Sequence, residues 1–306
     1  MKLKLQKLND LDAFTGHYKS DQVCLDALTE WRWGCDIICP YCGKHHCKKG
    51  YGGRYVCPVC KNKFSATVGT IFHGSKVGMR KWFIAMCLIS CHKKGISSLQ
   101  LSRDISVTQK TAWYMLHKIR TLFAQESKIF EGEVEVDEVY LGGKEYLKHK
   151  CKKVAGTQGR STKTKTPVFG IMQRGVISTV YAVKVPQTDR ATILPIINNR
   201  VLKNSHLFSD ESATYYPLSG MGYDHYIVNH KKGQYVNGKV YTNTIEGFWG
   251  HLRRMVVGIY HKTSPEHLQA YIDEAVWRYN NRRKTQDQRF CIMLGRSLHK
   301  VTYQMI

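Results

Sequence analysis

Two Cys-x-x-Cys pairs constrain the fold of this chain more than any other feature of its sequence. Cys39-Pro-Tyr-Cys42 and Cys57-Pro-Val-Cys60 are separated by 14 residues, one fewer than the usual window for a four-thiolate zinc site. Zinc prefers four soft ligands in a tetrahedron, and a two-residue spacer lets both thiolates of a pair reach one ion. The spacing therefore predicts a structural Zn²⁺ ion held by all four cysteines.

The segment around these cysteines, from Trp33 to Phe72, is rich in Cys, Gly, Lys and aromatic residues but has few aliphatic ones. It lacks the residues for a conventional apolar core, so we predict a metal-stabilised zinc ribbon over residues 31–75. Its Lys and Tyr side chains could meet nucleic acid, and a structural or protein-binding role fits the segment equally well. Four nearby residues outside the two pairs could compete as ligands: Cys35, His45, His46 and Cys47.

Length and charge narrow the class of protein further. A chain of 306 residues fits two or three compact units. Its 47 Lys+Arg against 23 Asp+Glu give a formal charge of +24, which favours nucleic acid as a partner, although ribosome-associated proteins share this balance. The longest uncharged apolar run, Trp82 to Cys91, is far shorter than the ~20 residues that span a bilayer. With 11 cysteines gathered mostly near the metal site, we expect a cytoplasmic protein with no membrane contact.

Helical patterns flank the ribbon. Residues 1–30 are expected to form a helical lead-in, and the pattern from Met79 to Phe123 predicts helices with a break at Ser106 to Thr108. Two short helices around a tight turn are typical of a helix-turn-helix, so residues 76–128 are predicted to be a DNA-binding region.

After Glu131 the pattern changes to strands. The stretches GEVEVDEVYLGG, TPVFGIMQRG and VISTVYAVKV are rich in β-branched residues and bounded by Gly or Pro, and helical patterns return at Arg190–Leu202 and after Thr244. The sequence thus predicts a multi-domain protein of the α+β or α/β class, with a mixed-sheet domain over residues 130–295. Between the first two strands, Lys144–Lys165 carries eight Lys or Arg residues and is expected to be a mobile basic loop.

Three carboxylates in this last domain are candidates for metal binding. Asp137 lies in the first strand, Asp210 follows the apolar pair Leu207-Phe208, and Glu246 begins a helical pattern. Two acids at strand ends and one on a helix can converge on a pair of Mg²⁺ ions, although any single acid can also be a surface charge. Strand alternation places Glu138 on the face opposite Asp137 and Glu135 on the same face.

The spacing and surroundings of these acids resemble those of a known family. Asp137, Asp210 and Glu246, with 35 residues between the last two, are similar to the DDE triad of insertion-sequence transposases. Together with the zinc ribbon, five stretches between residues 30 and 290 resemble the IS-fifteen-ninety-five (ISXO-two-like) family: VEVDEVYLGGK, TPVFGIMQRG, FSDESATYY, TNTIEGFWGHLRR and GIYHKTSPEHLQAYIDEAVWRYNNR.

The resemblance implies a ribonuclease H-like catalytic domain. Asp137, Asp210 and Glu246 would hold two catalytic Mg²⁺ ions, for which Mn²⁺ could substitute. Members of the family vary at the third position, some carrying Asn, and Asn243 lies nearby; we expect Glu246 because a carboxylate is the better Mg²⁺ ligand. A basic residue seven positions later completes the family signature, and here it is Arg253. Seven helical residues turn about 700°, so Arg253 should face the same way as Glu246, unless it is a surface side chain.

The implied activity is DNA transposition by a DDE-type transposase. Such an enzyme nicks the transposon end, and the freed 3′-hydroxyl attacks target DNA, which needs a homodimer or larger assembly on DNA at the nucleoid. Candidate contacts to the terminal inverted repeats in the helix-turn-helix are Lys110, Trp113, Lys118 and Arg120. Two alternatives remain: a domesticated zinc-ribbon DNA-binding regulator without catalysis, and a nuclease that cleaves without rejoining.

Overall fold

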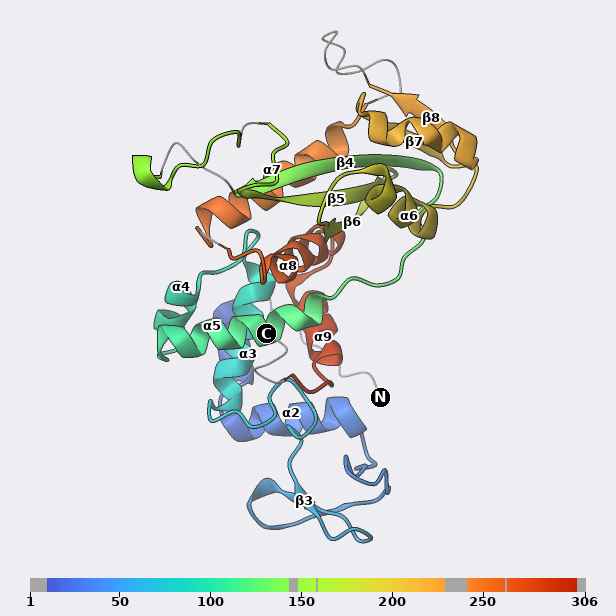
Figure 1. Cartoon of the computed structure of the whole chain (residues 1–306). Coiled ribbons are helices and arrows are strands. Elements are labelled where there is room, and N and C mark those ends of the chain that lie inside the picture. Colours follow the sequence, from blue (N-terminus) through green and yellow to red (C-terminus); the bar gives the residue numbers. More distant parts are fainter. Residues whose placement is uncertain (1–9, 143–147, 158, 229–240, 262, 302–306) are drawn as a thin grey trace. The chain divides into compact units, whose positions relative to one another are not determined.

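The computed structural model describes residues 10–142, 148–157, 159–228, 241–261 and 263–301, and the chain divides into two compact units (Figure 1). The first, here the split unit, combines Met1–Phe123 with Arg283–Ile306. The second, here the sheet unit, is the continuous segment Ala124–Arg282. Among the described residues, no helix is both long and apolar enough to cross a membrane.

The split unit consists of helices and a small ribbon. Its α-helices are α1 (Leu11–His17), α2 (Asp21–Trp33), α3 (Met79–Cys91), α4 (Ser98–Asp104), α5 (Gln109–Arg120) and α9 (Gln286–Arg296). The ribbon contains β1 (Lys48–Lys49), β2 (Tyr55–Val56) and β3 (Lys63–Phe64), which form an antiparallel sheet, with the 3-10 turn η1 (Tyr51–Gly53); a second 3-10 turn, η2 (Thr121–Phe123), follows α5.

The predicted pair of helices around a tight turn is present. Ser97 accepts a hydrogen bond from the backbone of Gln100 and caps α4, and Thr108 caps α5 through Thr111 in the same way. Between the two helices Ser106 has a φ of +51°, in the left-handed region that reverses the chain. The two helices pack on each other, which is the arrangement expected of a helix-turn-helix.

The split unit is completed by the last helix of the chain. Helix α9 packs against α3, where Phe290 makes edge contacts with the rings of Phe14 and Phe83 at centroid distances of 5.1 and 5.5 Å. All three rings are buried. The sequence pattern had placed residues up to 295 in the mixed-sheet domain, whereas the sheet unit ends at Arg282.

The sheet unit alternates strands and helices. Its strands are β4 (Glu133–Gly142), β5 (Lys165–Gln173), β6 (Thr179–Lys184), β7 (His206–Ser209) and β8 (Asp224–Ile227). Its helices are α6 (Arg190–Arg200), α7 (Asn243–Gly258) and α8 (Leu268–Asn280), and its 3-10 segments are η4 (Lys150–Lys152) and η5 (Ala213–Met221). The strands and helices predicted from the β-branched and helical patterns are therefore present.

The five strands form one mixed sheet in the order β6-β5-β4-β7-β8. Strands β4, β7 and β8 run parallel, and β5 is antiparallel to both β4 and β6. Helices α7 and α8 cover one face with an apolar core that includes Phe248 and Trp249, and α6 and η5 cover the other with a core that includes Tyr215. The sheet is therefore the middle of three layers, with β4 at its centre.

Candidate active site and metal centre

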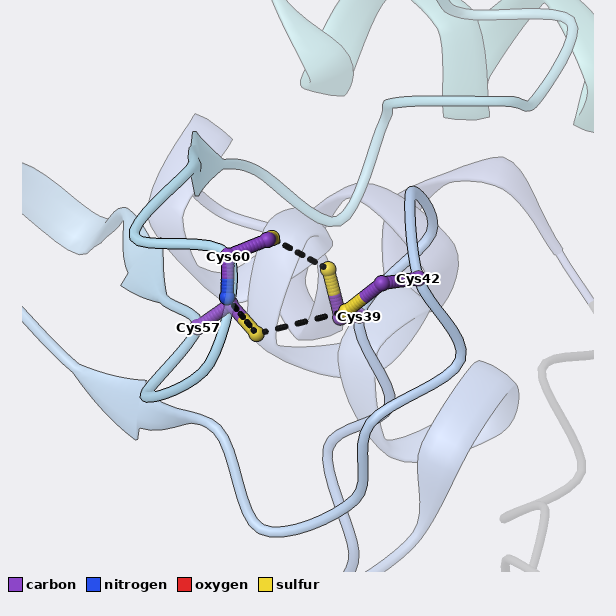
Figure 2. Close-up of side chains that lie close together, drawn as sticks. All are labelled: Cys39, Cys42, Cys57 and Cys60. Atoms are coloured by element: carbon purple, nitrogen blue, oxygen red, sulfur yellow. Dashed lines mark hydrogen bonds between the residues drawn. The ribbon is translucent and has the colours of Figure 1, made fainter.

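The four cysteines of the two Cys-x-x-Cys pairs meet in the ribbon (Figure 2). Their sulfur atoms all lie within 4.8 Å of one another, with Cys39 and Cys60 separated by 3.6 Å and Cys42 and Cys57 by 3.5 Å. Zinc–sulfur bonds of about 2.3 Å at tetrahedral angles place ligand sulfurs about 3.8 Å apart. The cluster could therefore hold a zinc ion without rearrangement of the backbone.

Both pairs build the same turn. The carbonyl of Cys39 accepts from Gly43 N–H at 3.0 Å, and that of Cys57 accepts from Lys61 N–H at 3.1 Å. Gly43 and Lys61 both have positive φ, 72° and 59°, so the two turns share a left-handed residue after the second cysteine. The repeated turn presents each pair of thiols to the same point.

The local environment favours the thiolate form of Cys57. Burial raises the pKa of the Cys57 thiol, but N–H groups of Cys60 and Val59 donate to its sulfur and lower that pKa to about 6. Of the residues that could have competed, His45 and His46 pair with Asp36, whereas Cys47 lies beside Cys57 but outside the group of four sulfurs. The four predicted cysteines are thus the ones that the fold brings together.

The second cluster lies where β7 ends beside the middle of β4. Glu135 pairs with Phe208 in the parallel register of the two strands, and two further residues along each strand lead to Asp137 and Asp210. Parallel neighbours with this register bring both carboxylates to the same edge of the sheet. The fold thus unites two of the three predicted acids, 73 residues apart in the sequence.

Asp137 is half-buried on the face covered by α7. The indole N–H of Trp249 donates to Asp137 Oδ2 at 3.0 Å. Burial raises the pKa of Asp137 to about 8, and repulsion from Glu138 and Asp210 adds to this rise, while the Trp249 hydrogen bond opposes it. A carboxylate in this position strongly favours a nearby cation.

Asp210 lies just beyond β7 and contacts a side chain of the basic loop. Its Oδ2 pairs with the guanidinium of Arg160, and its Oδ1 accepts from the backbone N–H of Ser212 at 3.0 Å. Part of the predicted basic loop, residues 143–147 and 158, falls outside the described residues. Arg160 therefore supplies a positive charge directly to this acidic edge.

Glu138 belongs to the same cluster, although it is not among the metal ligands predicted from the sequence. As strand alternation predicts, Glu138 lies on the opposite face from Asp137, where the phenol of Tyr215 donates to its Oε2. Its Oε1 nevertheless lies 3.6 Å from Arg160, and its side chain is only 2% exposed. Burial raises the pKa of Glu138, and repulsion from Asp210 adds to it. The sequence signal that could have identified Glu138 is its position directly after Asp137.

The third predicted acid, Glu246, lies in the first turn of α7. Its Oε1 accepts from Thr242 at 3.1 Å, and its side chain is exposed. Trp249, three residues later and on the same face of the helix, contacts Asp137. Among the described residues the three acids are not gathered as closely as the cysteines. Arg253 is also exposed, two turns after Glu246.

A buried ion pair fixes the start of α7 against the sheet. Glu135, fully buried on β4, accepts from Arg174 Nε at 2.7 Å and from the backbone N–H of Ile245 at 2.8 Å. The guanidinium of Arg174 lies between the rings of Phe208 and Tyr241, 3.9 and 3.7 Å from their centroids. A carboxylate at a helix N-terminus satisfies a backbone donor and complements the helix dipole. This pair therefore sets the position of the helix that carries Glu246.

Comparisons with known proteins identify the family of this chain. Residues 129–280 match the family model described as an ISXO2-like transposase domain. An uncharacterized transposase-like protein of Haemophilus influenzae is 33% identical over 102 residues, which cover 33% of this chain and 81% of that protein. The chain belongs to the ISXO2-like transposase family. A further relative, an uncharacterized protein in transposable element ISH50 of Halobacterium salinarum, is 29% identical over 250 residues, covering 78% of this chain and 83% of that protein.

Membership of this transposase family implies a DNA-processing enzyme in general. The matched segment contains Asp137, Asp210, Glu246 and Arg253, whereas the zinc ribbon lies ahead of it. The alignment with the Halobacterium protein covers 78% of the chain, which is more than the sheet unit and all the residues after it contain. The likeness therefore extends into the split unit.

The four candidate DNA contacts of the predicted helix-turn-helix differ in their exposure to solvent. Lys110 is exposed near the start of α5, and Trp113 is half-buried against the ring of His117. Lys118 and Arg120 are buried, at 2% and 3% exposed, and Lys118 Nζ donates to the carbonyl of Ile71 at 2.9 Å. We therefore withdraw Lys118 and Arg120 as DNA contacts, because the second half of α5 faces the interior of the protein.

Gly170 on β5 pairs with Asp137 and leaves room for Trp249. A Cβ at this position would lie 2.6 Å from two ring carbons of Trp249. We expect Gly170→Ala to displace the indole and to lower the free energy of unfolding by about 1–3 kcal/mol, as overpacking does. Urea unfolding followed by tryptophan fluorescence measures this change in the free energy of unfolding.

The matched control is Gly220→Ala, because a Cβ at Gly220 meets nothing within 4 Å. Equal stability of the two variants would contradict the packing of Trp249 on Gly170.

Proposed function

We propose that this protein is a DNA transposase that binds the terminal inverted repeats of its element and catalyses metal-dependent strand cleavage and strand transfer. The observation that carries the proposal is the neighbouring position of Asp137, in the middle of β4, and Asp210, just after β7, within the segment that matches the transposase family. The proposed reaction has two phosphoryl transfers. Hydrolysis of a phosphodiester frees a 3′-hydroxyl at the transposon end, and this hydroxyl then attacks a phosphodiester of the target.

The architecture of the sheet unit supports a ribonuclease H-like catalytic domain. Its five strands are mixed, with the antiparallel β5 beside the central β4, and helices cover both faces. In this arrangement β7 ends beside the middle of the central strand β4, and this brings Asp210 next to the position of Asp137. Acids in this position can act on a substrate lying across the ends of the strands.

The residues present fit Mg²⁺ as the metal. Asp137 and Asp210 offer the hard oxygen donors that Mg²⁺ prefers, and a single guanidinium already balances part of the charge there. Asp137, Asp210 and Glu246 would hold two ions. When bound, Mg²⁺ would supply Lewis-acid stabilisation of the attacking and leaving oxygens, and Mn²⁺ could replace it.

The chain itself supplies the positioning of these groups. Trp249 fixes the orientation of the Asp137 carboxylate, and the Glu135–Arg174 pair fixes the helix that bears Glu246 and Arg253. We assign Arg253 to a phosphate of the substrate, because a guanidinium matches phosphate geometry. Reactions of this type depend mainly on such positioning and on charge neutralisation.

The remaining parts of the chain would hold the DNA and the ribbon zinc. The four cysteines would bind one structural Zn²⁺ ion. We assign recognition of the inverted repeats to the exposed start of α5, with Lys110 and the half-buried Trp113, together with the ribbon. Joining two transposon ends needs two active sites, so we propose a dimer or larger assembly on DNA.

A strand-transfer assay tests the proposed function. The wild-type protein, Mg²⁺ and DNA that ends in the element's own flanking repeats are expected to give joined products, whereas Asp210→Asn should reduce them by at least about 10³-fold, as loss of a metal-ligating charge does. DNA binding by both proteins provides the control.

The assay also separates the rival activities. Cleavage without joining would identify a nuclease. Equal binding by both proteins with no cleavage in Mg²⁺ or Mn²⁺ would identify a DNA-binding regulator instead.

A further inference from the structure

We infer that Glu138 is an additional cation-binding carboxylate of this centre, and that the Arg160 guanidinium occupies the cation position until a divalent metal displaces it. The inference deepens the proposed function and rests on it for the nature of the metal. The carboxylates at this edge would then number four rather than three: Asp137, Glu138, Asp210 and Glu246.

One guanidinium joins acids from two strands. Arg160 pairs with Asp210 Oδ2 through Nη2, lies 3.6 Å from Glu138 Oε1 through Nη1, and donates to Ser212 Oγ at 3.2 Å. The acids come from the middle of β4 and from the residue after β7, so the positive charge lies where β7 ends beside β4. A bound divalent ion shared by Asp210 and Glu138 would need the same position.

Glu138 has an oxygen that is available to a cation. Its side chain is only 2% exposed, and Tyr215, itself fully buried, donates to Oε2. Oε1 is buried and accepts no hydrogen bond from the described residues. A buried carboxylate oxygen without a donor is costly unless a cation compensates its charge. The lone oxygen faces Arg160, which is the direction from which a metal would be bound.

Comparison with the other ion pair of the sheet unit indicates that the Arg160 contact is replaceable. In the Glu135–Arg174 pair the two side chains are 0% and 6% exposed, and aromatic rings enclose the guanidinium. The side chain of Arg160, in contrast, is 54% exposed and comes from the loop between β4 and β5. Because the Arg160 side chain is exposed, its guanidinium can return to water when a metal takes its place beside the acids, so the exchange costs little.

The exchange would couple metal binding to the basic loop. Once a divalent ion takes the position between Asp210 and Glu138, the Arg160 side chain is released. Its loop also carries the exposed residues Lys150, Lys152 and Lys153. A guanidinium released beside these lysines can bind a DNA phosphate next to the centre.

Mn²⁺ binding without DNA tests the inference. Arg160→Gln is expected to raise the affinity for Mn²⁺, measured by electron paramagnetic resonance of the free ion on the zinc-loaded protein, by about tenfold, which corresponds to about 1.4 kcal/mol. The matched control is Lys163→Gln, which removes the same charge from the same loop; Lys163 Nζ contacts the carbonyl of Ala155 rather than a carboxylate. The control should stay within about twofold of the wild type.

A second variant tests Glu138 separately from its partner. In the Arg160→Gln background, adding Glu138→Gln keeps an acceptor for Tyr215 but removes the charge, and it should lower Mn²⁺ affinity by at least about tenfold. Unchanged or weaker Mn²⁺ binding by Arg160→Gln, or no loss on adding Glu138→Gln, overturns the inference. Tight Mn²⁺ binding without any DNA cleavage would instead refute the proposed function and leave the inference standing.

Discussion

Replacing Cys57 with serine is expected to remove the bound zinc and unfold the ribbon. The buried cluster of the ribbon consists of only Cys39, Cys47, Tyr55, Cys57 and Phe64, and each of its strands spans two residues. So small a core cannot hold the segment by apolar burial alone. Structural zinc sites contribute about 10–16 kcal/mol of binding free energy that becomes folding free energy.

The measurement is zinc content together with limited proteolysis of the ribbon. Cys57→Ser should carry much less than one zinc per chain and should be cut rapidly within the ribbon. Cys35→Ser is the matched control, because Cys35 is an exposed free cysteine in the same segment and lies outside the four-sulfur group. Stoichiometric zinc in Cys57→Ser, or its loss in Cys35→Ser, would show that the ligands have been misassigned.

Asp137→Asn is expected to make the metal-free protein more stable, and the gain should grow with pH. The folded pKa of about 8 lies above the unfolded value of 3.8, so the folded state binds more protons than the unfolded state between these pH values. The free energy of unfolding of the wild type therefore falls as pH rises through this window. Asparagine removes the charge while its carbonyl can still accept from Trp249.

The free energy of unfolding of Asp137→Asn should exceed that of the wild type by an amount on the order of 4–6 kcal/mol at pH 8, and by little near pH 4. Urea unfolding at several pH values in Mg²⁺-free buffer measures it, with the exposed Glu266 replaced by Gln as the control. Addition of Mg²⁺ should reverse the order by stabilising the wild type and not the variant. A gain that stays constant across pH would show that Asp137 is ionised throughout.

The ribbon and the acidic edge could be predicted from the sequence because their determinants are local. Cys-x-x-Cys spacing defines a ligand set without knowledge of the rest of the fold, and an acid at the end of an apolar strand pattern lies at a sheet edge in any parallel arrangement. The partners of these groups could not be predicted in the same way. Arg160 reaches Asp210 from 50 residues away, and no periodic pattern marks that contact.

Two other differences between the prediction and the structure also arise from contacts between residues that are far apart in the sequence. Alternation placed Glu138 on the face opposite Asp137, which is correct, but its side chain still reaches Arg160, which also pairs with Asp210. Lys118 looked like a DNA contact because it is basic and lies on a helix next to a predicted turn. Its burial depends on the carbonyl of Ile71, 47 residues earlier in the chain.

The two-part construction of the split unit has a consequence for biosynthesis. The ribosome completes Phe14 and Phe83 early, but their partner Phe290 is synthesised only after the whole sheet unit. Until then the apolar face of α3 lacks α9 and is exposed to solvent. Chains that terminate prematurely would keep this face uncovered and be recognised by chaperones and proteases. Full-length synthesis thus becomes a condition for a properly assembled helix-turn-helix unit.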